Sequence, residues 1–299
     1  LYRLFRYREK RLRRFLKTSL LVLGTGFLAL SLFLVFHGLN YARPSLAGDM
    51  GLSVRDRSLE ELDSAVRRLA REASAVREGL PEDETGVLLG LSMKEIQASA
   101  QEGWDRLGLA YPLFQNRARM KPKGVLLSRY WSYTRIIGIY MPLLAEPSIN
   151  IDQPAFMHPA TAAHELSHAR GFAREGDCDF AGLLSCFYHP GPVWRYSGLV
   201  SAVKSMGGRL WEEDPDRWYA IYQSELSAAV QRDLALESAY WKKFETPVAR
   251  ISDQINDAYL KANKVEEGVK SYGAVVDLLL AWLDGDAFEE LTREVRGLE

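Results

Sequence analysis

An almost wholly apolar, uncharged run at residues 19–39 restricts how this chain can fold more than any other feature of its sequence. Its length of about 20 residues, at 1.5 Å per residue, is enough to span the hydrocarbon core of a bilayer. Buried core helices rarely run this far without a polar face. We therefore predict a transmembrane helix at residues 19–39 behind a basic segment at residues 1–18, whose positive charges are Arg3, Arg6, Arg8, Lys10, Arg11, Arg13, Arg14 and Lys17.

The other interpretation of this run is a signal peptide. The apolar core is too long for one, and no small-x-small cleavage site follows at residues 38–44. The positive-inside rule predicts a cytoplasmic N-terminus, with residues 40–299 on the extracytoplasmic side of the cell membrane. Because the chain begins with Leu1 rather than Met, we expect a fragment whose upstream part could contain another membrane helix.

The composition is that of an ordinary globular protein, with 47% hydrophobic and 26% charged residues. The formal net charge is -1 and the basic residues gather at the N-terminus, which argues against nucleic acid as a partner. Cys178 and Cys186 stand in a predicted helix at a spacing that puts their Cα atoms about 12 Å apart, beyond the reach of a disulfide.

Amphipathic helices with clear start signals follow the membrane segment. Residues 58–79 carry apolar side chains at helical spacing, with Ser58 as N-cap and Glu61 at the capping-box position. Ser92 and Glu95 repeat this signal at the start of a helix over residues 92–107. Later helical patterns cover residues 160–170, 174–188, 194–208, 215–240, 246–261 and 268–283.

Between these helices the sequence changes character. Residues 125–127, 136–140 and 148–151 are short runs of β-formers separated by Gly and Pro. They predict a small antiparallel β-sheet of about three strands. The whole is a mainly α fold with one small sheet (α+β). No repeat or low-complexity linker interrupts residues 40–299, which favours a single domain.

The segment His164-Glu165-Leu166-Ser167-His168 carries the clearest chemical signal. On a helix, His164 and His168 project from one face and can reach the same metal ion. Glu165 stands beside them, where it can hold a metal-bound water and take its proton. This is the H-E-x-x-H pattern of zinc peptidases. A chance match is the alternative, because the chain has five histidines.

A catalytic zinc ion needs a third protein ligand and an open position. Gly171 can end the helix in the left-handed conformation and return the chain to the metal. The returning segment offers Glu175 as the ligand, with Asp177 as the alternative. Asp179 is placed to orient a ligating histidine as a hydrogen-bond partner. The remaining histidines, His37, His158 and His189, have no motif around them and are expected to be structural or at the surface. His189 is also a second alternative to Glu175 as the third ligand.

Further blocks of sequence accompany this motif: Asn40-Tyr41-x-Arg43-Pro44, Pro122-Lys123, Gly138-x-Tyr140-x-Pro142, Glu146 with Asn150, the zinc motif continued as Gly171-Phe172-Ala173-x-Glu175, Arg195-Tyr196-Ser197-Gly198, Asn256-Asp257-x-Tyr259-Leu260-Lys261-x-Asn263 and Gly268-Val269-x-Ser271-Tyr272-Gly273-x-Val275-Val276. Together they resemble a bacterial membrane-protein family catalogued as domain of unknown function 3810 (DUF3810). The resemblance implies a zincin-like domain behind membrane helices, usually more than one. It brings no established substrate.

The chain departs from the family pattern after Glu175. The family continues as acidic-Glu-Ala-Asn-Phe, where this chain has Gly176-Asp177-Cys178-Asp179-Phe180. The Asp at 177 shortens a possible ligand while position 175 keeps its glutamate, which favours Glu175. The spacing of Glu175 and Asp179 is also similar to the Glu-x-x-Ala-Asp element that supplies the third ligand in peptidases that process prenylated CAAX proteins.

These residues predict a membrane-anchored metallopeptidase that uses Zn²⁺ to hydrolyse a peptide or protein substrate, since histidine and carboxylate ligands favour zinc. Glu165 would deprotonate the zinc-bound water and deliver the proton to the leaving amine. Tyr196, Tyr259 and Tyr272 are candidate oxyanion donors, with core packing as the other interpretation. Residues 138–146 are a candidate edge strand for an extended substrate, with a place in the sheet core as the other interpretation.

Two other classes of protein stay open. One is a non-catalytic, zinc-stabilised binding or sensor domain anchored in the membrane, in which Glu165 would be dispensable. The other is a structural membrane-anchored protein without metal, in which replacing His164 would change neither metal content nor stability. The intact Glu165 favours catalysis, because a structural site needs no general base between its histidines.

Overall fold

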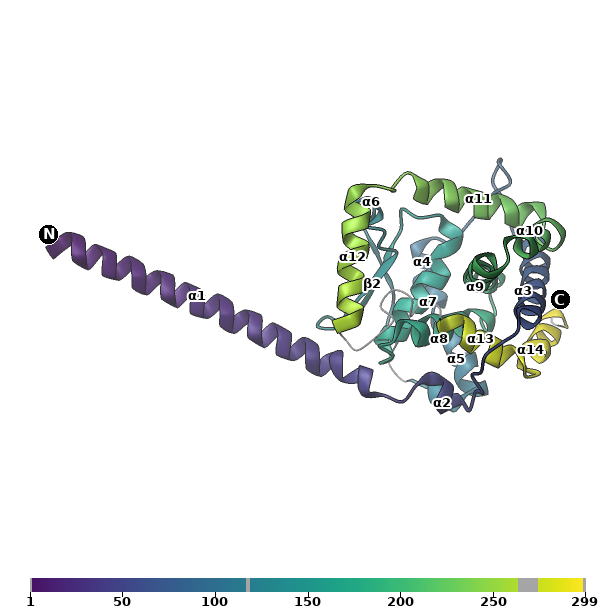
Figure 1. Cartoon of the computed structure of the whole chain (residues 1–299), viewed down its shortest axis with the longest axis horizontal. Helices are drawn as coiled ribbons and strands as arrows, with labels where there is room; N and C mark the ends of the chain where they lie inside the picture. The colour runs from purple at the N-terminus through teal and green to yellow at the C-terminus, as the bar shows by residue number, and fades with distance from the viewer. Residues whose placement is uncertain (1, 117–118, 263–273, 298–299) are drawn as a thin grey trace.

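The computed structural model describes residues 2–116, 119–262 and 274–297, and one long helix, α1 (Tyr2–Phe36), projects from the rest of the molecule (Figure 1). Residues 2–18 of the basic segment and residues 19–36 of the apolar run form this one continuous helix, which ends three residues before the predicted boundary at 39. Within the described residues it is the one helix long and apolar enough to cross a membrane, and no part of its apolar window is buried. This supports a membrane anchor or a signal sequence.

The remaining described residues are mostly helical, as the sequence predicts. The 3₁₀ turns are η1 (Gly38–Ala42), η2 (Pro112–Phe114) and η3 (Ala155–Met157). The helices are α2 (Leu46–Met50), α3 (Leu59–Glu78), α4 (Met93–Ser99), α5 (Glu102–Ala110), α6 (Ser128–Tyr133), α7 (His158–Ala169), α8 (Glu175–Phe187), α9 (Pro192–Glu213), α10 (Pro215–Ser224), α11 (Ala228–Lys242), α12 (Pro247–Ala262), α13 (Ala274–Leu283) and α14 (Ala287–Arg296).

Side-chain caps begin several of these helices. Ser58 and Glu61 form the predicted capping box at the start of α3, and Ser92 and Glu95 form the other at α4. Two predicted helices are each divided in the structure. Residues 92–107 become α4 and α5, and residues 215–240 become α10 and α11, where the Ser227 side chain accepts the Val230 N–H and begins a new helix.

The sheet contains β1 (Lys123–Val125), β2 (Gly138–Met141) and β3 (Glu146–Asn150), with β3 in the centre. β2 pairs antiparallel with β3, but β1 pairs parallel with it, so the prediction of an antiparallel sheet is wrong for β1. The reason is the connection. β2 and β3 are joined by a short turn, whereas β1 is linked through α6 and β2, a crossover that permits parallel pairing. Among the described strands, β2 is an edge strand, so the prediction of an edge strand at residues 138–146 holds for residues 138–141, whereas Glu146 begins the central strand β3.

The core lies where α7, α8 and α9 pack together and α9 packs on α3. Gly182 of α8 sits so close to α7 that a Cβ there would lie 3.0 Å from the His164 backbone nitrogen. A fully buried ion pair joins Arg77 of α3 to Asp233 of α11 at 2.6 Å. This core fixes α8 against α7 and therefore positions the residues that both helices present.

Candidate metal centre

Helix α7 presents two histidines on adjacent turns of one face, His164 and His168, with ring centroids 4.9 Å apart. The helix ends at Ala169, and Gly171 follows with a φ of +86°, the left-handed conformation that glycine adopts at small cost. The chain then returns, so that α8 begins at Glu175 and packs against α7. The predicted turn at Gly171 is confirmed.

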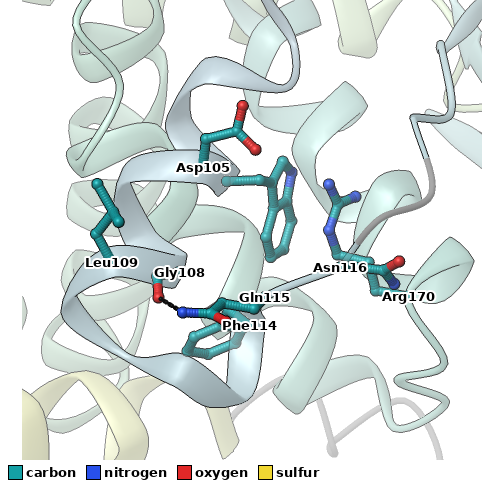
Figure 2. Close-up of a pocket in the computed structure, with 8 residues that line it drawn as sticks. Asp105, Gly108, Leu109, Phe114, Gln115, Asn116 and Arg170 are labelled. Atoms are coloured by element: carbon teal, nitrogen blue, oxygen red, sulfur yellow. Dashed lines mark hydrogen bonds between the residues drawn. The ribbon is translucent and has the colours of Figure 1, made fainter.

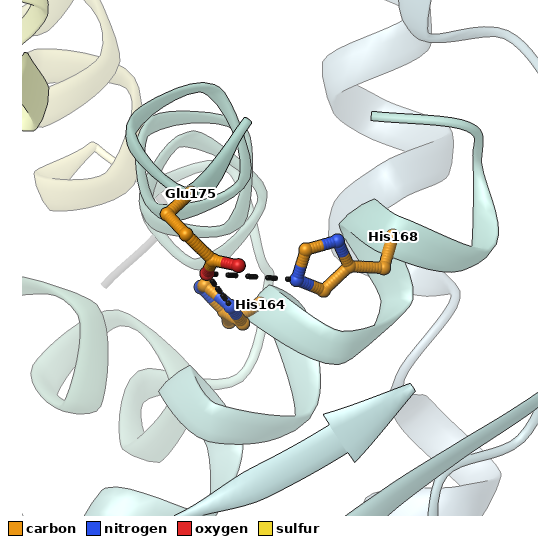
Figure 3. Close-up of side chains that lie close together, drawn as sticks. All are labelled: His164, His168 and Glu175. Carbon is orange, nitrogen blue, oxygen red and sulfur yellow. Dashed lines mark ion pairs between the residues drawn. The ribbon is translucent and has the colours of Figure 1, made fainter. Parts of the chain in front are cut away.

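Three side-chain atoms converge in front of this face, as Figure 3 shows. Glu175 Oε2 lies 3.3 Å from His164 Nε2 and 3.7 Å from His168 Nε2. The three ligand atoms all lie within 4.8 Å of one another. The structure thus brings together the two histidines of the motif and the glutamate expected as third ligand.

Each imidazole is held by its other nitrogen. His164 Nδ1 lies 2.7 Å from Asp179 Oδ1, and His168 Nδ1 lies 3.1 Å from the Phe172 carbonyl oxygen and 3.2 Å from Cys178 Sγ. A carboxylate and a carbonyl only accept hydrogen bonds, so each Nδ1 carries the hydrogen. Both Nε2 atoms are then free to offer a lone pair at the point where Glu175 also ends.

The side chain of Glu165 is 3% exposed and interacts electrostatically with His164, His168 and Glu175. Its Oε2 makes no hydrogen bond with any described residue. Gly138, at the start of β2, leaves room for this carboxylate, because a Cβ at that position would lie 2.3 Å from Glu165 Oε1. Burial raises the pKa of Glu165 to about 7. An unpaired buried carboxyl group is costly, and such groups gather at functional sites.

The charges of the cluster suit a cation. Burial alone would lower the pKa of His164, but the carboxylates of Asp179 and Glu175 outweigh it and raise that pKa well above its ordinary value. Burial would raise the pKa of Glu175, but the imidazoles of His168 and His164 outweigh it and hold that pKa well below its usual range. The surrounding carboxylates therefore favour positive charge at the point where the three ligand atoms meet.

The two aspartates of α8 have different partners. Asp179 bonds His164, the orienting role that the sequence predicts for it. Asp177, the alternative ligand, instead accepts the Leu46 backbone N–H at 3.3 Å and lies 3.5 Å from the Arg174 guanidinium. Asp177 is not part of the cluster. It fastens the segment after α1 to the start of α8.

Of the three candidate oxyanion donors, Tyr196 is fully buried and its hydroxyl donates to Asp233 at 2.6 Å. This bond gives Tyr196 a core role beside Arg77 instead of a place at the cluster, so its selection as a donor is wrong. The side chain of Tyr259 and all of Tyr272 lie outside the described residues.

Two of the remaining histidines are structural, as expected. His158 Nε2 lies 3.0 Å from the Gln153 carbonyl oxygen. His189, the second alternative to Glu175, has its Nε2 3.0 Å from the Ser99 carbonyl oxygen, and its Nδ1 accepts the Gly191 N–H. Neither belongs to the cluster.

The third histidine, His37, has a neighbour that the sequence did not reveal. It follows the last residue of α1, is 6% exposed, and its ring centroid lies 6.0 Å from that of His168 and 6.3 Å from that of Tyr140. Tyr140 of β2 in turn stacks on His168. His37 and Tyr140, which both pack against His168, therefore come from segments that are distant in sequence from the zinc motif. The one signal for them was the occurrence of Tyr140 in a DUF3810-like block.

The link after α1 is also bound to the site. Arg43 Nη1 donates to the Gly171 carbonyl oxygen at 2.9 Å, and its guanidinium lies 4.7 Å from the centre of the Phe172 ring. Arg174 donates back to the Tyr41 and Arg43 carbonyl oxygens. The Asn40-Tyr41-x-Arg43-Pro44 block therefore clasps the turn that positions Glu175.

A separate pocket of about 250 Å³ lies near the end of α7 (Figure 2). The Arg170 guanidinium lies over the Trp104 ring at 4.1 Å and donates to Gln101 Oε1. No residue of the three-residue cluster lines this pocket, whose walls are Trp104, Asp105, Gly108, Leu109, Phe114, Gln115, Asn116 and Arg170.

No curated protein and no solved structure matches the chain. Residues 1–280 match the model of a family described as a protein of unknown function, DUF3810. That match extends over α1, the clasped link, the cluster and most of the helices around it. The chain therefore belongs to the DUF3810 family.

Proposed function

We propose that the chain is a membrane-anchored, zinc-dependent metallopeptidase with a zincin-like domain. The observation that carries the proposal is the convergence of His164 Nε2, His168 Nε2 and Glu175 Oε2 beside the buried, unpaired Glu165 carboxyl group. Three ligands and a neighbouring acid–base group are the components of a hydrolytic zinc site.

The residues fit a zinc ion. Nitrogen and oxygen ligands about 2.0–2.1 Å from zinc in a tetrahedral arrangement lie about 3.4 Å apart. The two distances from Glu175 Oε2 to the histidines, 3.3 and 3.7 Å, agree with this spacing. The Asp179 and Phe172 contacts hold both imidazoles in the tautomer that ligation requires. Three protein ligands leave the fourth position open.

A bound zinc ion would activate water and polarise the peptide carbonyl. Glu165 would accept a proton from the attacking water and return it to the leaving amine. Gly138 permits this by leaving the carboxylate room beside β2. The substrate would lie extended along β2, an edge strand whose Tyr140 stacks on His168.

We also propose that α1 is the anchor, with its basic end in the cytoplasm and the domain on the extracytoplasmic side. The basic residues before the apolar run support this orientation. The peptidase would then act on peptides or proteins outside the cytoplasm.

One observation favours a second candidate, a zinc-stabilised binding domain without turnover. His37 and Tyr140 close over His168, which is 8% exposed, and structural zinc sites are closed. Glu165 separates the two candidates, because only catalysis needs its carboxylate.

Metal analysis of the full chain in detergent tests the site. We expect about one zinc per chain in the wild type and a loss of zinc in His164→Ala, His168→Ala and Glu175→Ala. Asp177→Ala is the matched control and should keep its zinc. A folded wild type without zinc after loading and dialysis would overturn the metal site.

Incubation of the zinc-loaded chain with a peptide library, read by mass spectrometry, tests catalysis. The wild type should cleave peptides, while Glu165→Gln should keep zinc and lose most of the activity. Equal cleavage by both proteins would exclude Glu165 as the general base. Zinc binding without cleavage would favour the binding domain.

A further inference from the structure

Helix α12 carries an apolar stripe that faces away from the domain. Val248, Ile251 and Ile255 recur at helical spacing and are 52%, 57% and 66% exposed. The contact with the domain is made by a different side of the helix, where Ala249 is 2% exposed. An amphipathic helix whose apolar side has no protein partner among the described residues is typical of helices that lie in a membrane interface.

The end of β2 and the turn that follows it expose a second apolar group. Met141, Leu143 and Leu144 are large, apolar and 47–68% exposed. The α12 helix lies next to the segment that leads into β2, since Arg135 approaches Asp253 at 3.9 Å. We call the six residues of the stripe and of this second group the apolar face: Met141, Leu143, Leu144, Val248, Ile251 and Ile255.

The elements that carry the apolar face lie on the side of the domain from which α1 departs. Figure 1 shows α12 and β2 on that side, with α10 and α14 on the opposite one. The link between α1 and the domain is short and clasped by Arg43 and Arg174. A bilayer crossed by α1 would therefore adjoin this side of the domain, and the clasp would limit rotation away from it.

We propose that the apolar face docks on the lipid bilayer, so that the domain touches the membrane at a second place besides α1. The proposal rests on the anchoring role of α1 given above and is independent of peptidase activity. Partial insertion of Leu144 and Ile251 removes exposed apolar surface from water at the depth of the headgroups. The cluster, which contacts the end of α1 through His37, would then lie at the membrane surface.

Fluorescent labels at single introduced cysteines test this docking in the full chain. The native Cys178 and Cys186 are buried and should not react. An environment-sensitive label is placed through Leu144→Cys or Ile251→Cys in chains reconstituted into phospholipid vesicles. Leu28→Cys in α1 reports insertion of the anchor. Tyr219→Cys, at an exposed position of α10, reports the side of the domain opposite to the apolar face. Brominated lipid quenches labels in the bilayer, and iodide quenches labels in water.

We expect the labels at 144 and 251 to be quenched by brominated lipid to an extent comparable with that at 28, and several-fold more than that at 219. Quenching by iodide should show the reverse order. Labels at 144 and 251 that behave like the label at 219, while the label at 28 is in lipid, would overturn docking and leave the anchor intact. Protection from both quenchers would indicate a second copy of the chain on this face and would also overturn it. A label at 28 in water would overturn anchor and docking together.

Discussion

Different acceptors orient the two imidazoles of the cluster, and one of them is a charged side chain that can be removed. We predict that Asp179→Ala weakens zinc binding by about 10–100-fold, because His164 loses the partner that fixes its tautomer and ring orientation. Competition with a chromophoric chelator measures the affinity. Asp177→Ala, on the same helix, is the matched control and should bind zinc like the wild type. Equal affinities for all three proteins would contradict the orienting role.

A second residue-scale prediction concerns His189. Burial lowers the pKa of His189 to about 4, from 6.5 in the unfolded chain. Between these values the unfolded state binds more protons than the folded state, so stability decreases as the pH falls. His189 therefore contributes stability above pH 6.5 that is lost on acidification toward pH 4, at most about 3 kcal/mol.

Chemical unfolding at pH 7.5, 6, 5 and 4 measures this effect. The His189→Gln variant retains a donor that can reach the Ser99 carbonyl oxygen but does not titrate. Its unfolding free energy should fall less between pH 6.5 and 4 than that of the wild type. Identical slopes would show that His189 is not the group responsible.

At the scale of elements, α5 and α8 cross at a glycine. A Cβ on Gly103 would lie 2.1 Å from the Ser185 carbonyl oxygen, which is backbone and cannot move without shifting α8. We predict that Gly103→Ala lowers the free energy of unfolding by about 1–3 kcal/mol. Gly208, inside α9, has open space instead, because apart from its chain neighbours and the backbone of its own helix no atom lies within 4 Å of the place that a Cβ would take. Gly208→Ala should raise stability by about 0.5–1 kcal/mol. Thermal unfolding of both variants measures the difference, and destabilisation by both would refute the crossing argument.

The elements that the sequence predicts well are those with local causes. The capping boxes at Ser58 and Ser92 and the turn at Gly171 depend on residues within a few positions of each other. The same holds for His164, His168, Glu175 and Asp179, which helical spacing and one turn bring together. Parallel pairing of β1 with β3 depends on contacts distant in the chain, which hydrophobic periodicity does not contain. The break before Ser227 has a local cause, the Ser227 cap, but the apolar periodicity runs across it.

The same distinction explains what was missed at the site. His37 and Tyr140 reach His168 from the end of α1 and from β2, so no spacing rule connects them with the zinc motif. Tyr196 was selected from its sequence block, but its hydroxyl is bound by Asp233 of α11, a partner 37 residues away.

At the scale of the whole molecule, Arg174 ties the segment after α1 to the domain. Its guanidinium donates to the carbonyl oxygens of Tyr41, Arg43 and Pro44. We predict that Arg174→Ala frees this link and that a nonspecific protease cuts residues 38–46 several-fold faster than in the wild type. Mass spectrometry of the first fragments locates the cut. Arg209→Ala, which removes only surface ion pairs, is the control and should leave the cutting rate unchanged.

The clasp also decides how metal binding should be measured. A fragment that begins at Leu52 lacks His37 and Arg43, so it uncovers one wall of the cluster and releases the turn before Glu175. Zinc analysis is therefore informative on the full chain.

If α1 is a membrane anchor, as proposed above, the contact between His37 and His168 fixes the distance of the cluster from the bilayer. The two ring centroids are 6.0 Å apart, which corresponds to about two residues of extended chain. A peptidase with this geometry would select its scissile bond by height above the bilayer, within a few residues of the point where a substrate's own anchor leaves the lipid. The side chains around the bond would then matter less than the length of the tether that brings it there.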